Sequence, residues 1–339
     1  MMKRILFTVF TLLAVSCGCS RQGNDIPEEW PWIDPDADNE PWVEITDGRF
    51  GSLPDYIKVY HSPDVLNGKA AVAYIATADL SKAEFHVWGL RDPELDGSPD
   101  ALKTPTQVYN TSDSPVLVMN GGFFYVDSGI NYPASLAVEE GELLSPNINY
   151  ASEDWVTMYY PTKAAFILHK NGRTEASWTY FAGQDAHYIY PAPAENSYGS
   201  TPKQTPNAGF PVGATAFEAK TAIGAGPVLI KNGEIKNTWR FECLPGDYDV
   251  NCANPDPRTA IGVTADGRLV LFVCEGRGMT EGVAGYSTEN VASLLLEFGC
   301  TDAINLDGGG SSCLLVNGME TIKPSDGAQR PVGSCVYVK

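Results

Sequence analysis

Several common catalytic motifs are missing from this sequence. The chain holds only four histidines, and none of them sits in a metal-ligand motif. It has no Cys-x-x-Cys pair, no Gly-x-Ser-x-Gly nucleophile elbow and no Gly-x4-Gly-Lys-Ser/Thr phosphate loop. These absences argue against a zinc site, a serine hydrolase of the α/β type and a P-loop nucleotidase.

Basic residues are also scarce. Lys and Arg number 23 against 42 Asp and Glu, which gives a formal net charge of -19. Such a charge argues against nucleic acid as a partner. An anionic substrate would need a locally basic pocket in so acidic a chain, so individual arginines gain significance.

The first residues are typical of an export signal. Lys3 and Arg4 precede the apolar run 5–15, which is too short to span a membrane. The run ends in Ala-Val-Ser-Cys-Gly-Cys, which resembles a bacterial lipoprotein signal. Cys17 is the best candidate for lipidation and Cys19 the second; an ordinary cleaved signal is the alternative. We expect an exported, membrane-anchored lipoprotein, periplasmic or at the cell surface.

An acidic tether is predicted to follow this signal. Residues 22–48 hold nine acidic side chains, four prolines and neither Lys nor Arg. A segment of this composition repels itself and stays extended. Three tryptophans, Trp30, Trp32 and Trp42, are candidates for docking it onto the domain or a partner. The expected organisation is therefore a signal over 1–19, a tether over 20–48 and a single catalytic domain over 49–339.

Strand patterns dominate this last region. Short apolar runs rich in branched or aromatic residues occur at 70–76, 83–90, 116–119, 164–169, 259–264 and 269–273. Asp266-Gly267 predicts a hairpin between the last two. One helix is clear, with Ser287 as its cap, apolar residues at helical spacing and Gly299 at its end. We predict an α+β fold, a mixed and mainly β-sheet core with packed helices.

Two features of this region carry further predictions. Residues 184–213 hold five prolines without a clear period and are interpreted as a long loop, with a lid over the site as its function. Cys243 and Cys252 flank a turn and are the best pair for a disulfide in an exported chain. Cys274, Cys300, Cys313 and Cys335 allow three pairings or remain buried free thiols.

The densest cluster of functional residue types is Asn-Leu-Asp-Gly-Gly-Gly-Ser-Ser at 305–312. Three adjacent glycines cost backbone entropy, which a chain accepts where the backbone takes positive φ or approaches another group closely. The preceding apolar strand and the packed helix place Asp307 at the end of a sheet, which makes it a candidate for chemistry. A plain strand–turn–strand would also use glycines.

Further motifs accompany this run in order along the chain. They are Asn120-Gly121-Gly122-Phe123-Phe124, Gly224-Ala225-Gly226-Pro227, Asn232-Gly233, Pro257 to Val263, Glu275-Gly276-Arg277, Pro324-Ser325-Asp326 and Arg330-Pro331. With this set the chain resembles the phosphodiester glycosidase family over roughly residues 70–339. One departure is Glu275, where the family often has Asp.

Carboxylates, arginines, amides and glycine turns suit a sugar-phosphate substrate. We expect Asp307 to act as nucleophile or as base for water, with Glu275 as the second carboxylate. The remaining candidates would bind the substrate: Arg258, Arg277 and Arg330 the phosphate, Asn120 and Asn305 sugar hydroxyls or the phosphate, and Ser311 a phosphate oxygen, while Gly121, Gly122, Gly308 and Gly309 would let backbone amides approach the ligand. Structural roles, namely turn formation for Asp307 and surface ion pairs for the arginines, are the alternatives.

The resemblance implies a hydrolase that cleaves a sugar-1-phosphodiester, similar to an N-acetylglucosamine-1-phosphodiester, on an extracytoplasmic phosphoglycan. No cofactor is expected, although a divalent cation at Asp307 stays open. Two alternatives remain. One is a metal-dependent phosphodiesterase that cuts the P–O bond, and the other is a non-catalytic surface module that binds glycans through its aromatic residues.

Overall fold

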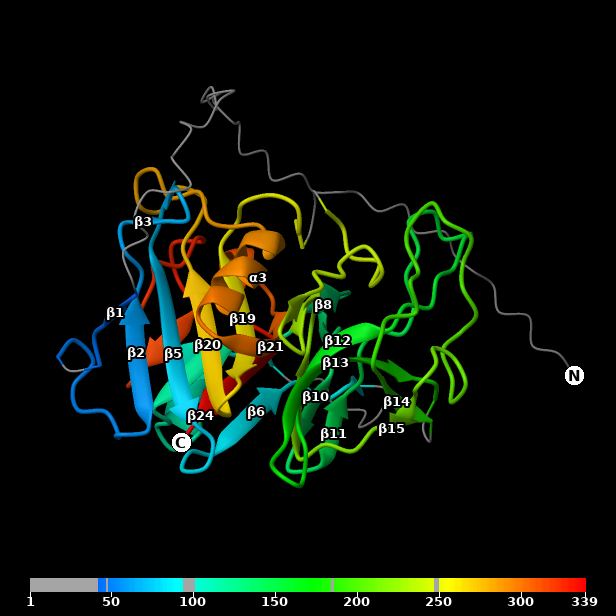
Figure 1. Cartoon of the computed structure of the whole chain (residues 1–339), viewed down its shortest axis with the longest axis horizontal. Helices are drawn as coiled ribbons and strands as arrows, with labels where there is room; N and C mark the ends of the chain where they lie inside the picture. The colour runs from blue at the N-terminus through cyan, green and yellow to red at the C-terminus, as the bar shows by residue number, and fades with distance from the viewer. Residues whose placement is uncertain (1–41, 47, 94–100, 184–185, 247–249) are drawn as a thin grey trace, which may run out of the picture.

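The computed structural model describes residues 42–46, 48–93, 101–183, 186–246 and 250–339. The predicted signal, its Cys17 and most of the predicted tether therefore lie outside the described residues. Antiparallel β-sheets are the dominant regular structure of the described residues (Figure 1).

Three sheets organise the described residues. The first has eight strands, in the spatial order β1 (Val43–Glu44), β2 (Ile57–His61), β5 (Ala73–Asp79), β20 (Arg268–Cys274), β19 (Arg258–Thr264), β21 (Cys300–Asn305), β17 (Val228–Lys231) and β18 (Glu234–Ile235). The second has seven, in the order β11 (Glu142–Ser145), β10 (Ala137–Glu139), β16 (Thr221–Gly224), β12 (Lys163–Leu168), β13 (Thr174–Phe181), β14 (His187–Tyr190) and β15 (Thr215–Ala216). The third has five, in the order β23 (Met319–Glu320), β22 (Leu314–Val316), β7 (Leu117–Asn120), β24 (Ser334–Val338) and β6 (Phe85–Gly89). Two further hairpins are β3 (Val65–Leu66) with β4 (Lys69–Ala70), and β8 (Phe124–Asp127) with β9 (Ile130–Pro133).

The eight-stranded sheet is buried on both faces, which explains its nearly continuous apolar strands. Along β20, Leu269, Leu271 and Val273 face the main core, which is shared with the other two sheets. The alternate residues Val270 and Phe272 face a second core. Side chains alternate between the faces of a strand, so one apolar run supplies two cores.

Helix α3 (Thr288–Glu297) covers the second core (Figure 1). The side chain of Ser287 accepts a hydrogen bond from the Asn290 amide and caps the helix. Gly299, just beyond the C-cap, has φ +103°, which favours glycine. The N-cap at Ser287, the buried apolar face and the end at Gly299 are all as predicted, so the sequence prediction for this helix is confirmed.

The expected α+β class overstates the helical part of the fold. The two α-helices with described bounds are α2 (Pro105–Thr111), of seven residues, and α3, of ten. The fold is mostly β-sheet, because strand pairs close most of the core by themselves. Among the described residues no helix has the length and apolar character needed to cross a membrane.

Short turns join neighbouring strands into hairpins, and the predicted hairpin at Asp266-Gly267 is confirmed. Asp266-Gly267 joins β19 to β20, Asn171-Gly172 joins β12 to β13, and Asn317-Gly318 joins β22 to β23. The predicted loop 184–213 is wrong at its start, where β14 pairs with β13. A lid function for the rest of this segment stays a prediction.

The predicted tether ends earlier than residue 48. Val43 and Glu44 form β1 and pair with β2 at the edge of the eight-stranded sheet. Trp42 makes edge-to-face contacts with Phe272 and Phe298 at 6.5 and 6.2 Å, so this tryptophan docks onto the domain as expected.

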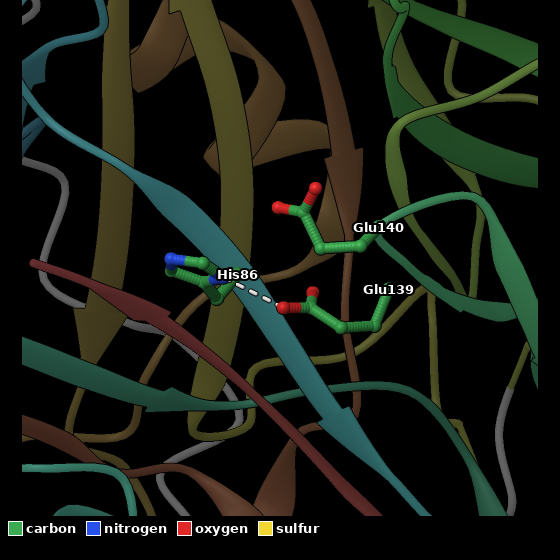
Figure 2. Close-up of side chains that lie close together, drawn as sticks. All are labelled: His86, Glu139 and Glu140. Carbon is green, nitrogen blue, oxygen red and sulfur yellow. Dashed lines mark hydrogen bonds and ion pairs between the residues drawn. The ribbon is translucent and has the colours of Figure 1, made fainter.

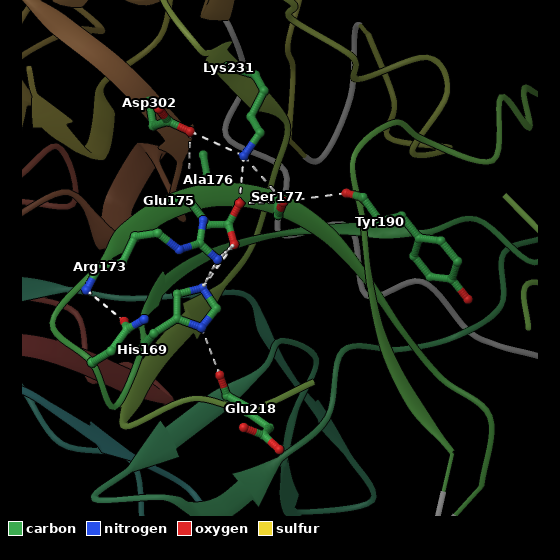
Figure 3. A network of polar contacts seen from close by, with 10 residues as sticks. His169, Arg173, Glu175, Ala176, Ser177, Tyr190, Glu218, Lys231 and Asp302 are labelled. Atoms are coloured by element: carbon green, nitrogen blue, oxygen red, sulfur yellow. Dashed lines mark hydrogen bonds and ion pairs between the residues drawn. The ribbon is translucent and has the colours of Figure 1, made fainter. Parts of the chain in front are cut away.

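A network of buried ion pairs ties two sheets together (Figure 3). Glu175 on β13 accepts hydrogen bonds from Lys231, Arg173 and His169 at 2.7, 2.8 and 2.8 Å. Lys231 on β17 also lies 3.4 Å from Asp302 on β21. Each buried charge thus has a partner, which keeps the strand that leads to Asp307 in register with the seven-stranded sheet.

All six cysteines beyond the signal are buried free thiols, and the predicted disulfide between Cys243 and Cys252 is not formed. Cys243 packs in a small cluster with Ala151 and Tyr159. The carbonyl of Cys252 accepts the amide of Thr288 at the start of α3. The position of each thiol depends on local packing of this kind. The turn between the two cysteines is therefore not enough to predict a disulfide.

Candidate active site

Asp307 lies where the end of β21 meets the end of β7. Its amide donates to the Gly121 carbonyl at 3.0 Å, and its carbonyl accepts from Asn120 Nδ2 at 2.6 Å. Leu306, one residue earlier, still donates to Thr259 on β19. The backbone at Asp307 is therefore held from two sides, by β19 of the eight-stranded sheet and by the residues at the end of β7 in the five-stranded sheet.

Asp307 is half-buried, and the environment of its carboxyl group opposes ionisation. Burial raises its pKa to about 6. Hydrogen bonds from Ser311 and the Gly308 amide, together with the charge of Arg330, lower the pKa but do not cancel the effect of burial. A carboxyl group with a pKa close to neutrality is suited to proton transfer or nucleophilic attack.

Each glycine of the run leaves room for a different neighbour. A Cβ atom on Gly308 would lie 2.7 Å from the Pro257 carbonyl oxygen. On Gly309, where φ is +57°, it would lie 2.6 Å from Nη2 of Arg277. On Gly310 it would collide with the guanidinium of Arg330 and the carboxylate of Asp326. The run thus brings two arginines against the backbone that follows Asp307.

These arginines are held by Asp256 and Asp326, of which only Asp326 lies in one of the motifs named above. Arg277 makes two hydrogen bonds to Asp256, at 2.7 and 3.0 Å. Arg330 donates from Nε and Nη2 to Asp326 at 2.9 and 2.6 Å, and Nη1 lies 3.5 Å from Ser311 Oγ.

The side chains of Arg277 and Arg330 remain 46% and 40% exposed. Both arginines form the ion pairs named as the alternative, yet part of each guanidinium stays exposed, so phosphate binding by these two residues stays a prediction.

The Asn120-Gly121-Gly122 motif supports the site instead of contacting a ligand. Asn120 is buried, and its Oδ1 accepts from Thr259 Oγ1 and the Cys313 amide. The amides of Gly121 and Gly122 donate to the carbonyl and hydroxyl of Ser334. The predicted ligand contacts of these three residues are wrong, because their polar groups already bind the protein.

The predicted phosphate contact of Arg258 is also wrong. Its guanidinium is buried and donates to the carbonyls of Tyr286, Val250, Asn251 and Asn254. The arginine therefore binds the loop before β19 to the segment that enters α3. It is neither the predicted phosphate ligand nor the alternative surface ion pair.

Replacing Arg258 with lysine should destabilise the protein without removing its chemistry. One ammonium cannot serve four carbonyls, and each buried carbonyl left without a donor costs about 1–3 kcal/mol. We expect a lower urea midpoint and unchanged turnover per folded molecule. Loss of turnover at unchanged stability would contradict this structural role.

Three buried polar atoms without hydrogen-bond partners occur in the motif segments. They are Glu275 Oε2, Asn305 Oδ1 and Ser325 Oγ. The other oxygen of Glu275 accepts the Lys323 amide at 2.9 Å, and Asn305 Nδ2 donates to the Gly226 and Leu306 carbonyls. Unsatisfied buried groups are the ones that a ligand or water would satisfy. Ligand contacts of Glu275 and Asn305 therefore stay predictions.

The profile of the phosphodiester glycosidase family matches residues 113–339, which includes every segment of this site. The chain belongs to the phosphodiester glycosidase family.

Curated relatives resemble part of this family domain. The chain is 43% identical over 118 residues to the uncharacterized SPβ prophage-derived protein YomE of Bacillus subtilis, which covers 34% of this chain and 16% of that protein. It is 40% identical over 113 residues to human N-acetylglucosamine-1-phosphodiester alpha-N-acetylglucosaminidase, which covers 32% of this chain and 21% of the human protein. The matched part is therefore about a fifth or less of each relative's length.

Solved structures of the phosphodiester glycosidase fold extend this likeness. The catalytic domain of the zebrafish N-acetylglucosamine-1-phosphodiester alpha-N-acetylglucosaminidase, auto-inhibited by its pro-peptide, superposes with a TM-score of 0.58 at 19% identity and covers 85% of both chains. A hypothetical protein from Synechocystis has a TM-score of 0.56 at 16% identity and covers 89% of this chain and 64% of that one. Both comparisons establish the fold.

One group of side chains in the described residues has the composition of a metal site, but it lies elsewhere. His86, Glu139 and Glu140 bring their ligand atoms within 4.8 Å of one another (Figure 2). His86 Nδ1 lies 2.6 Å from Glu139 Oε1, and Glu139 Oε2 accepts the Val87 amide. The group joins β6 to β10, and its contacts are those of a structural ion pair.

Proposed function

We propose that this chain hydrolyses a sugar-1-phosphodiester, with an N-acetylglucosamine unit on the sugar side. The main support is the placement of the Asp307 carboxyl group, whose pKa is raised to about 6, near the half-exposed Arg330, with Arg277 against the backbone of Gly309. The similarity to the human N-acetylglucosamine-1-phosphodiester alpha-N-acetylglucosaminidase supports the choice of sugar.

The arginines and the carboxyl group of the site would have separate roles in the reaction. The phosphate would bind to the exposed edges of Arg330 and Arg277, and the anomeric carbon would face Asp307. When the C1–O bond breaks, the electron pair leaves on the phosphate oxygen as a second negative charge. Asp307 would attack the anomeric carbon, or take a proton from the attacking water, so the hydroxyl of water ends on the sugar.

We further propose that no divalent cation is required. The charged neighbour of the Asp307 carboxyl group is Arg330, and Asp326 and Asp256 are already paired with arginines. Arginine can supply the positive charge that a metal would bring to the phosphate. Export and a membrane anchor are also part of the proposal, and the resemblance of residues 1–19 to a bacterial lipoprotein signal supports them.

Product analysis in oxygen-18 water tests the reaction. Residues 20–339 would be incubated with UDP-N-acetylglucosamine and with an alkyl N-acetylglucosamine-1-phosphodiester, with and without chelator. We expect free N-acetylglucosamine that carries the label, in amounts that the chelator does not change. Label in the phosphate would support the alternative phosphodiesterase, and sensitivity to chelator would refute the metal-free mechanism.

The proposed role of Asp307 also predicts a pH profile. A nucleophile or base acts in its ionised form, and the pKa of Asp307 is raised to about 6. Turnover of a phosphodiester, which does not titrate in this range, should therefore rise with pH through about 6 and level off above it. A profile that falls through the same pH would instead assign Asp307 as a general acid.

A further inference from the structure

A cavity of about 590 Å³ lies beside the β8–β9 hairpin, outside the contacts that hold Asp307. Its lining residues include Tyr125, Tyr132, Tyr150, Phe181, His187 and Asp92. They come from the hairpin, from the loop after β11 and from the facing ends of β13 and β14. None of the lining residues belongs to the arginine-bearing motifs of the site.

Two tyrosines of this cavity are open to solvent. Tyr125 and Tyr150 are 45% and 42% exposed. Tyr125 stacks on Tyr132 with ring centroids 5.1 Å apart and planes at 12°, so the pair forms one rigid platform. Tyrosines combine a large apolar face with a polar tip, a combination enriched at binding surfaces.

The charge of the lining defines the class of ligand. Among the described residues the lining contains Asp92 and His187 but neither lysine nor arginine, so it suits a phosphate poorly. Tyrosine hydroxyls, Asn149 and Asp92 are suited to hydroxyl groups, and the tyrosine rings are suited to the apolar face of a sugar ring. A neutral carbohydrate satisfies both requirements.

The backbone connects this cavity directly to the candidate active site. Gly121 accepts the Asp307 amide, and two residues later Phe123 pairs with Ala134 at the base of the hairpin. Tyr125 follows Gly121 by four residues, which is at most about 13 Å of extended chain. A short glycan attached to the scissile phosphodiester can span that distance.

We propose that this cavity is a carbohydrate subsite, which holds a neutral sugar unit of the substrate beyond the phosphodiester cleaved at Asp307. The inference rests on the proposed function for the identity of the reaction. The sugar-binding property itself is independent of it.

Two measurements on residues 20–339 test this subsite. Binding of mannotriose and of chitotriose is measured by titration calorimetry for the wild type and for Tyr125→Ala, Tyr125→Phe and Phe241→Ala. Phe241 is a matched control, because it is 39% exposed but lines a different cavity. We expect at least one trisaccharide to bind, about tenfold more weakly to Tyr125→Ala, with smaller effects of the other two variants. Binding of neither trisaccharide, or equal binding to Tyr125→Ala, overturns the subsite.

Kinetics separate the subsite from the reaction. An N-acetylglucosamine-1-phosphodiester of methanol is compared with one of mannotriose. Tyr125→Ala should raise KM about tenfold for the mannotriose ester and leave the methyl ester unchanged. Equal effects on both esters would overturn the subsite. If no ester is hydrolysed by any variant, the proposed function fails, while the binding measurement still decides the subsite.

Discussion

Asp307→Asn should abolish turnover and, at pH 7 and above, make the protein more stable. The amide keeps the shape of the carboxyl group but cannot act as nucleophile or base, so we expect a loss of at least about 10³-fold in kcat. The gain in stability follows from burial, which holds the pKa of Asp307 at about 6 against an ordinary value of 3.8.

The pH range of this effect follows from the sign of the shift. The native state holds the Asp307 proton more tightly than the unfolded state does, so the wild type loses stability as pH rises from about 4 to about 6. Two pKa units correspond to about 3 kcal/mol, which is the upper limit of the gain in the variant. Below pH 4 the carboxyl group is protonated in both states and the advantage disappears.

Thermal unfolding of both proteins between pH 4 and pH 8 measures this difference. Asp302→Asn provides a control on β21, the strand that leads to Asp307, because Asp302 is buried and lies 3.4 Å from Lys231. That variant leaves a buried cation with fewer partners and should be less stable than the wild type at pH 7. If Asp307→Asn were also less stable than the wild type at pH 8, the hydrogen bonds from Ser311 and Gly308 would stabilise the ionised carboxylate by more than its burial costs.

Local sequence signals predicted the scaffold around Asp307 well. The cap at Ser287, the end at Gly299 and the Asp266-Gly267 hairpin each depend on a few neighbouring residues, and each is confirmed. The position of Asp307 at a strand end follows from the same kind of information. Fold class was less accurate, because the amount of helix depends on how well three sheets cover one another.

Long-range contacts decided the roles that the sequence could not assign. Arg258 begins β19 in a family motif, yet four carbonyls from residues 250–286 surround its guanidinium. Asn120 looks like a ligand group and instead holds the Asp307 carbonyl. Asp326 lies only four residues before Arg330, whereas Asp256 lies 21 residues before Arg277, so only the first of these ion pairs is local in the sequence.

The glycine run 308–310 shows why the residue types of a motif are not enough to predict the contacts of a site. Three glycines indicated close approach without indicating what approaches. In the structure each one admits a different partner, namely the Pro257 carbonyl, Arg277 and Arg330. A sequence motif therefore marked the location of the charges, while their pairing with Asp256 and Asp326 needed the folded chain.

Arg330→Ala should lower kcat/KM by about 10²–10³-fold, with most of the loss in kcat. The bound diester carries one negative charge on phosphorus oxygens, and the departing monoester develops a second. An arginine beside the leaving oxygen therefore stabilises the transition state more than the ground state. Arg268→Ala is the control, because Arg268 has a similar exposed pair with Asp266 at the β19–β20 hairpin.

A second readout distinguishes this role from mere support of the fold. Arg330 lowers the pKa of Asp307, so its removal should raise that pKa and move the rising limb of the pH profile above about 6. Inorganic phosphate should also inhibit the variant more weakly. An unchanged pH profile with unchanged phosphate inhibition would leave Arg277 as the remaining arginine for the phosphate, because Arg258 is already bound to backbone carbonyls.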